Sequence, residues 1–241
     1  HKTEVYIVTA VDKDSWPDGI GKIRFGFSGS KKSQFPNTKA FANAYLQAVD
    51  AYREVRTTID QSDHADQQLR DREVMLRAEM ESFTSLRDLR VGDVVQVPPL
   101  TPHSLLHGVT VVEFQTPHYE RYILSFAQKV LTQDHWDTES ALPLLNFATD
   151  TPLCTISGDI IADFDDFLVN RIKLSPGESF IVEEQRYCIV MLIIGEVTLA
   201  NTLAATGSAF YLPKSSERVI SNDGSTDSLV LLAMPQEGSR L

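Results

Sequence analysis

Cysteine, long apolar runs and an excess of positive charge are all lacking in this sequence. Cysteine occurs only at Cys154 and Cys188, which excludes a disulfide framework and a cysteine-based zinc finger and makes the reducing cytoplasm the expected location. No apolar run approaches the ~18–20 residues of a membrane-spanning helix, so no membrane partner is expected. Lys and Arg number 22 against 33 Asp and Glu, a net charge of −11. A surface of that sign repels phosphate backbones, so nucleic acid is not an expected partner.

The length is sufficient for one large domain or two ordinary ones. Of the 241 residues, 42% are hydrophobic, as in a globular protein with a sizeable core. The chain begins with His1 rather than Met and runs directly into a strand-like segment. We therefore expect sequence upstream of His1 to be missing. The sequence does not indicate an oligomeric state.

The hydrophobic pattern divides the chain into β segments and one helical segment. Residues 4–10, 22–27, 93–97 and 109–115 are typical of strands, because they are rich in β-branched and aromatic residues or alternate polar with apolar ones. From residue 38 to about 89, apolar residues recur at three- and four-residue spacing, which predicts a helical cover on a sheet. A second β unit is predicted at 165–174, 177–182, 187–194, 196–202, 207–212, 218–221 and 229–234. We expect a mainly β protein with a helical insertion.

One motif carries chemical information. Residues 92–103 read Gly-Asp-Val-Val-Gln-Val-Pro-Pro-Leu-Thr-Pro-His. The strand ends at Pro98, and a turn made rigid by prolines then directs the imidazole of His103 toward the mouth of a small β-barrel. A neutral imidazole in that position is a good zinc ligand. The spacing of Gly, Pro and His resembles the second cupin motif, with Leu100 standing where the family has glycine.

Further segments resemble type I phosphomannose isomerases, a family of the cupin superfamily. Residues 2–6 read Lys-Thr-Glu-Val-Tyr and resemble that family's Lys-Thr-Glu-x-Trp-Tyr strand. Similar segments also occur at 22–27, 101–109, 112–115 and 207–213. The resemblance implies two tandem cupin (jelly-roll) β-barrels with an α-helical insertion in the first. The implied boundaries are 1–37 and 88–125 for the first barrel, 38–87 for the insertion, 126–150 for a linker and 151–241 for a second barrel without a metal site.

The resemblance also implies one zinc ion per chain. In that family the ion is held by a Gln and a His from an upstream segment, by the Glu of Lys-Thr-Glu and by the His of Thr-Pro-His. The last two correspond to Glu4 and His103, and the remaining ligands are expected upstream of His1. Strand parity separately places Lys2, Glu4 and Tyr6 on one face. The alternative for Glu4 is an exposed carboxylate on an edge strand.

Lys2, Glu113 and Arg121 are the candidate catalytic residues. The family has a glutamate followed by an essential arginine, and these correspond to Glu113 and Arg121; the alternative for Arg121 is a surface residue near a barrel rim. Lys2 and Arg121 would supply positive charge for an anionic sugar phosphate. Glu113 would transfer a proton or orient the groups that do so. His118, in the same segment, could also face the site.

These correspondences imply an aldose–ketose isomerase that interconverts mannose 6-phosphate and fructose 6-phosphate through a cis-enediol, with zinc as Lewis acid. Two alternatives stay open. One is a non-catalytic sugar-binding cupin derived from the isomerases, which the departures at Leu100 and before Arg121 favour. The other is an iron-dependent cupin oxygenase, which uses two histidines and a carboxylate, whereas this chain offers one good histidine.

Overall fold

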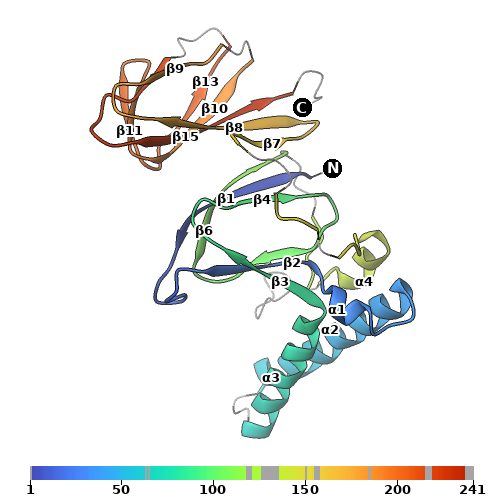
Figure 1. Cartoon of the computed structure of the whole chain (residues 1–241). Coiled ribbons are helices and arrows are strands. Elements are labelled where there is room, and N and C mark those ends of the chain that lie inside the picture. The colour runs from blue at the N-terminus through green and yellow to red at the C-terminus, as the bar shows by residue number, and fades with distance from the viewer. Residues whose placement is uncertain are drawn as a thin grey trace.

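The computed structural model describes residues 2–62, 64, 66–117, 121–125, 136–149, 151–154, 158–183, 186–214 and 219–236. His118 and residues 126–135 of the predicted linker lie outside the described residues. The described chain forms two β units, with a group of helices attached to the first (Figure 1). None of the helices in this described part combines the length and the hydrophobicity that a membrane-spanning helix needs.

The first β unit consists of two three-stranded antiparallel sheets, with strand orders β4-β1-β6 and β3-β2-β5. Its strands are β1 (Glu4–Val11), β2 (Gly21–Phe27), β3 (Thr84–Leu89), β4 (Val94–Val97), β5 (His103–Leu105) and β6 (Val109–Gln115). The four strands predicted here are confirmed, and β3 and β5 are additional. Apolar side chains of both sheets, such as Val8, Phe25 and Val95, pack together in the interior.

The helical insertion is confirmed, but it ends earlier than predicted. It contains α1 (Gly29–Lys32), α2 (Thr38–Asp60) and α3 (Gln67–Ser82), and α2 and α3 project from the first β unit as a hairpin (Figure 1). Asn37 and Asp66 cap α2 and α3, because each side chain accepts a hydrogen bond from a backbone N–H of the first turn. Residues 84–89 pair as a strand with β2, so the helical part stops short of residue 87.

The segment after β6 packs into the core of the helical region. It contains α4 (Thr138–Ala141) and the 3-10 helix η1 (Leu142–Leu144). Trp136 and Leu142 are buried in one hydrophobic cluster with Tyr45 and Tyr52 of α2. The described part of the predicted linker therefore packs against the helices of the first unit and is not a free connection between the units.

The second β unit has a five-stranded sheet of order β13-β10-β15-β8-β7 and a four-stranded sheet of order β12-β11-β14-β9. Its strands are β7 (Ile160–Asp163), β8 (Phe167–Leu174), β9 (Ser179–Ile181), β10 (Cys188–Ile194), β11 (Glu196–Leu199), β12 (Thr202–Ala205), β13 (Ala209–Leu212), β14 (Val219–Ser221) and β15 (Ser228–Pro235). Side chains from both sheets, including Val190, Leu199 and Leu232, form its core. Among the described residues no strand pairing joins the two sheets of either unit. Each predicted barrel is therefore observed as two separate sheets and not as a closed barrel.

Strand β1 lies where the two units meet and is buried on both faces (Figure 1). Val5 and Ile7 pack against Ile161, Val169 and Leu231 of the second unit in one hydrophobic cluster. Tyr6 and Val8 point the opposite way, into the core of the first unit. This alternation follows from the two-residue period of a strand.

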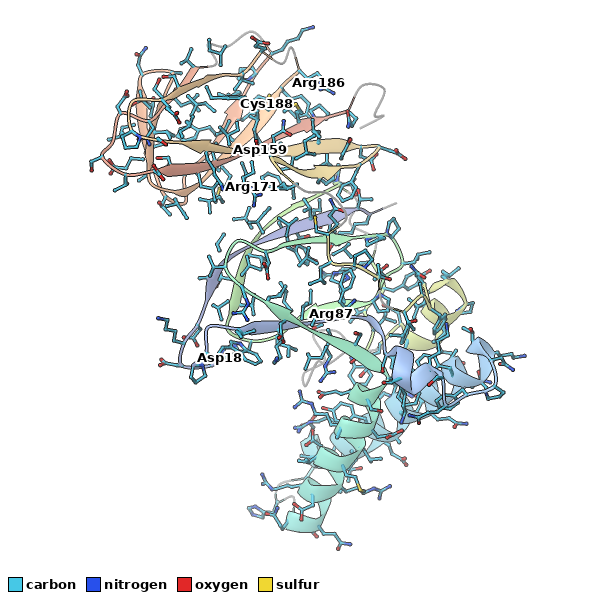
Figure 2. All side chains as sticks on the ribbon, viewed as in Figure 1. Asp18, Arg87, Asp159, Arg171, Arg186 and Cys188 are labelled. Carbon is cyan, nitrogen blue, oxygen red and sulfur yellow. The ribbon has the colours of Figure 1, made fainter. Side chains whose placement is uncertain are left out.

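Arginine side chains hold the segment that connects the units. Figure 2 labels Arg87 in the first unit and Arg171 and Asp159 in the second. Arg87 Nη2 donates to the carbonyl oxygen of Thr151 at 2.8 Å. Arg171 Nη2 donates to the carbonyl oxygen of Gly158 at 2.9 Å. The connection is therefore fixed by hydrogen bonds at both ends.

Candidate metal centre

The structure brings Glu4 and His103 together on the inner face of the first β unit. Glu4 lies on β1, the central strand of its sheet, and is only 6% exposed. The alternative of an exposed edge-strand carboxylate is therefore wrong. His103 begins β5 in the other sheet, and its Nε2 lies 3.2 Å from Oε2 of Glu4. The two residues predicted as ligands thus converge across the space between the sheets.

A tight turn orients His103. The N–H of Thr101 donates to the carbonyl oxygen of Pro98 at 3.2 Å, and Leu100 has φ of +62°. These features match a type II turn, in which proline favours the second position and glycine the third. Pro99 satisfies the first preference, while Leu100 adopts a left-handed conformation that favours glycine. The predicted proline turn is present, and it places the imidazole beside Glu4.

Two further side chains complete the cluster: Lys2, which precedes β1, and Tyr6 on β1. Lys2 Nζ lies 2.8 Å from Oε1 of Glu4, as expected from strand parity. The hydroxyl of Tyr6 donates to Oε2 of Glu4, and its oxygen lies 2.8 Å from Nε2 of His103. Sequence reasoning did not single out Tyr6 as a functional residue. The available signal was its position two residues after Glu4, which puts both side chains on one face.

The contacts of Glu4 determine its ionisation. Burial would raise the pKa of Glu4, but hydrogen bonds from His103, Lys2 and Tyr6 outweigh burial and lower the pKa from 4.5 to about 2. Burial also raises the pKa of Tyr6, and the hydrogen bond to the Glu4 carboxylate and the nearby charge of Glu113 raise it further. In this arrangement Glu4 is a carboxylate and Tyr6 a hydrogen-bond donor.

Glu113 and Arg121 lie beside this cluster. Glu113 is exposed on β6 and stands directly opposite Tyr6 in the strand register. Desolvation and the negative charge of Glu4 raise the pKa of Glu113, while the positive charges of Lys2 and Arg121 oppose this effect. Arg121 itself is exposed. The charges of Glu4, Lys2, His103 and Arg121 therefore all act on the ionisation of Glu113. Lys2 and His103 also contact Glu4 directly.

The donor atoms of Glu4 and His103 fit a zinc ion. Nδ1 of His103 carries a hydrogen, because it lies 3.0 Å from the carbonyl oxygen of Thr101, which only accepts. Nε2 of His103 faces Oε2 of Glu4 at 3.2 Å, and an imidazole nitrogen and a carboxylate oxygen are both atom types that bind zinc. Thr101 and Lys2 hold the outward atoms of the two ligands, as the supporting partners of metal ligands commonly do.

The number of ligands is smaller than a zinc site requires. Within the ranges that the structure describes, no group of three His, Cys, Asp or Glu side chains could hold a metal. Zinc sites in proteins use at least three protein ligands. Glu4 and His103 therefore account for two positions of such a site.

The fold resembles solved structures of phosphomannose isomerase. A histidine-to-alanine variant of that enzyme from Salmonella typhimurium superposes with a TM-score of 0.67 and 13% identity, over 98% of this chain and 66% of its own. A zinc-bound mannose 6-phosphate isomerase gives 0.61 and 13%, over 98% and 66%. The apo form from Salmonella typhimurium gives 0.61 and 13%, over 98% and 67%.

At this level of identity the likeness establishes the fold: mainly β, with several antiparallel sheets and a helical insertion. The chain spans about two thirds of the length of these solved enzymes. Its sequence matches no protein-family model and no curated protein.

Proposed function

We propose that this chain forms part of a zinc-dependent aldose–ketose isomerase that interconverts mannose 6-phosphate and fructose 6-phosphate. The observation that carries the proposal is the convergence of Glu4 and His103, at 3.2 Å, inside a unit with the fold of phosphomannose isomerases. We also infer that the two β units are tandem cupin barrels, the first interrupted by the helices. The facing sheets of each unit support that inference.

The residues around the cluster fit the chemistry of proton transfer between C1 and C2. When bound, zinc would supply Lewis acidity toward the sugar's carbonyl and hydroxyl oxygens. Glu113 would move the proton, and its raised pKa brings it closer to neutral pH, where a general base works best. Lys2 and Arg121 would stabilise the negative charge of the enediolate or hold the phosphate. A protein with a net charge of −11 needs such local cations to bind an anionic substrate.

The test is formation of fructose 6-phosphate from mannose 6-phosphate by the chain supplied with Zn²⁺. We expect turnover that is lost on chelation and restored by zinc. Glu113→Gln should lower kcat by ~10²–10⁴-fold with unchanged zinc affinity, because it removes a proton-transfer group. Glu139→Gln, an exposed change on α4, is the matched control. Turnover that persists after complete chelation would refute the role of zinc, and a normal kcat in Glu113→Gln would refute the role of Glu113.

The second candidate is a non-catalytic sugar-phosphate-binding protein of the same fold. It is favoured by the number of candidate zinc ligands among the described residues, which is two, Glu4 and His103. A zinc enzyme needs at least three protein ligands. Calorimetry separates the two candidates. Binding of mannose 6-phosphate without any turnover, under conditions where Zn²⁺ is bound, would support the second candidate and refute the first.

A further inference from the structure

One end of the second β unit carries an exposed apolar surface that the proposed function does not use. Ile189 on β10 and Tyr211 on β13 are 41% and 63% exposed. They are register partners, so their side chains stand side by side on one face of the five-stranded sheet. The ring centroid of Tyr187 lies 5.6 Å from that of Tyr211. Tyr187, Ile189 and Tyr211 together are called the β13 patch below.

The β13 patch continues an apolar face that the first unit covers elsewhere. Met191 lies two residues after Ile189 on the same face of β10, and it packs against the cluster that joins the two units. Ala233 of β15, the register partner of Ile189, also belongs to that cluster. Figure 1 shows β13 on the side of the second unit away from the first. Contiguous exposed apolar side chains, unlike single ones, indicate a contact surface.

β13 is also an open edge of its sheet. In the part of the chain that the structure describes, β13 pairs with β10 alone. The N–H of Leu192 donates to the carbonyl oxygen of Ser208. Hydrogen-bonded positions alternate along an antiparallel pair, so Phe210 bonds to β10, whereas Ala209 and Tyr211 direct their N–H and C=O groups outward. The strand contains no charged residue and no proline, two features that block pairing at an edge.

We propose that β13 is a self-association surface, through which two copies of this chain pair antiparallel about a two-fold axis and form one continuous sheet. In such an interface the same patch serves both copies. With the axis at Phe210, the outward N–H and C=O groups of Tyr211 in each copy meet those of Ala209 in the other. A large side chain then stands opposite a small one on the face of the β13 patch.

The residues of this edge favour a second copy as the partner. The register about Phe210 pairs outward-directed backbone groups with outward-directed groups, as an antiparallel ladder requires. It also places Phe210 of one copy opposite Phe210 of the other, and aromatic pairs of this kind stabilise adjacent strands. The β13 patch has no charged residue, which matters because a net charge of −11 makes two copies repel each other elsewhere.

The interface is small, because each copy contributes a strand of four residues and the β13 patch. We therefore expect weak association, with a Kd of about 1–100 µM. Added salt should strengthen it, since salt screens the repulsion between two acidic chains.

The experiment is analytical ultracentrifugation of the full 241-residue chain, at concentrations from well below to well above that Kd. The mass should rise from 26.9 kDa toward twice that value. Tyr211→Lys should weaken association by at least ~10-fold, because a central tyrosine is lost and lysine on an edge strand opposes pairing. Leu203→Lys is the matched control and should leave association unchanged, because Leu203 is 67% exposed on β12, an edge of the other sheet.

A mixture of Ala209→Cys and Tyr211→Cys tests the register. Residues directly opposite each other in a hydrogen-bonded antiparallel pair have Cα atoms about 5.5 Å apart, which a disulfide can span. Under oxidising conditions the mixture should give more covalent dimer than either variant alone.

The inference is overturned if the chain stays at 26.9 kDa at every concentration, even if an extended peptide binds at β13. It is also overturned if Leu203→Lys weakens association as much as Tyr211→Lys does, or if the cysteine mixture cross-links no better than the single variants. Isomerase turnover tests the proposed function separately, because the β13 patch shares no residue with the site in the first unit.

Discussion

Leu100 occupies a backbone conformation that favours glycine, and this leads to a quantitative prediction. Its φ of +62° lies in the left-handed region, at the third position of the turn that precedes His103. A non-glycine residue pays about 1–2 kcal/mol there, because its Cβ approaches the carbonyl oxygen. Glycine avoids this cost but loses about 0.4–1 kcal/mol through its greater freedom in the unfolded chain. At this position Leu100→Gly should therefore be more stable than Leu100→Ala by roughly 0.5–1 kcal/mol.

The comparison with alanine matters because Leu100 is 46% exposed. Both substitutions remove the same partly buried side chain beyond Cβ, so their difference isolates the backbone effect. Leu86 on β3 provides a matched control, since it is a leucine with 45% exposure in a strand and its φ is not positive. There glycine should be less stable than alanine by about 0.5–1 kcal/mol. The expected sign therefore reverses between the two positions.

Thermal and urea unfolding of the four variants would test this. For a chain of this size, 1 kcal/mol corresponds to about 2–4 °C in Tm, so the glycine variant at position 100 should melt about 2 °C above the alanine variant. The urea midpoints should shift in the same order with unchanged slopes. Equal stability of the two variants at position 100, or greater stability of Leu100→Ala, would refute the argument that the turn is strained.

Two other predictions concern Glu4 and the junction of the β units. Because the folded-state pKa of Glu4 is about 2 against an ordinary 4.5, its contribution to stability is present above about pH 4.5 and is lost as the pH falls through about 2. Urea unfolding between pH 2 and 6 should show about 3 kcal/mol of pH-dependent stability that Glu4→Gln lacks. At the junction, Leu231 is fully buried, and Leu231→Ala should cost about 2–5 kcal/mol in urea unfolding at neutral pH.

Glu139→Gln should keep the pH dependence of the unmodified protein, and the same pH dependence in Glu4→Gln would show that Glu4 does not have the low pKa. Leu203→Ala, at a leucine that is 67% exposed, should change stability by less than about 0.5 kcal/mol. A loss in Leu231→Ala as small as that would mean that the two units do not pack through this cluster.

Much of the fold could be predicted from the sequence because local patterns decide it. β-branched and aromatic composition or alternation predicted β1, β2 and β6 within one or two residues, and the helical spacing from residue 38 predicted the start of α2. The sequence did not reveal that residues 196–202 contain a turn, because Ala200 and Asn201 lack the usual Asn-Gly signal. Both have positive φ and form a two-residue hairpin between β11 and β12. β3 was missed because it is rich in charged residues, as α3 before it is, so the sequence shows no change of composition between the two elements.

The site was predictable only in part. Glu4, His103 and Lys2 could be chosen from motifs and strand parity, and the structure places them in contact. Strand parity places Tyr6 on the same face but does not show that its hydroxyl takes part, because a tyrosine in a strand ordinarily packs as an aromatic side chain. Its hydroxyl gains importance only through His103, which lies in a different sheet and far away in the sequence. Contacts of this kind arise from tertiary structure and leave no local pattern.

The double burial of β1 has a thermodynamic consequence. One face of this strand holds Glu4 and Tyr6, and the other holds Val5 and Ile7 against the second β unit. Detaching the strand would therefore break the contacts of Glu4 and Tyr6 with His103. The same event would expose the apolar cluster between the two β units. Any ligand bound by Glu4 adds its binding free energy to that event, about 2.7 kcal/mol at a concentration one hundred times Kd. Occupancy of the site in the first unit should thus protect the second unit from unfolding, although Glu4 and His103 both belong to the first unit.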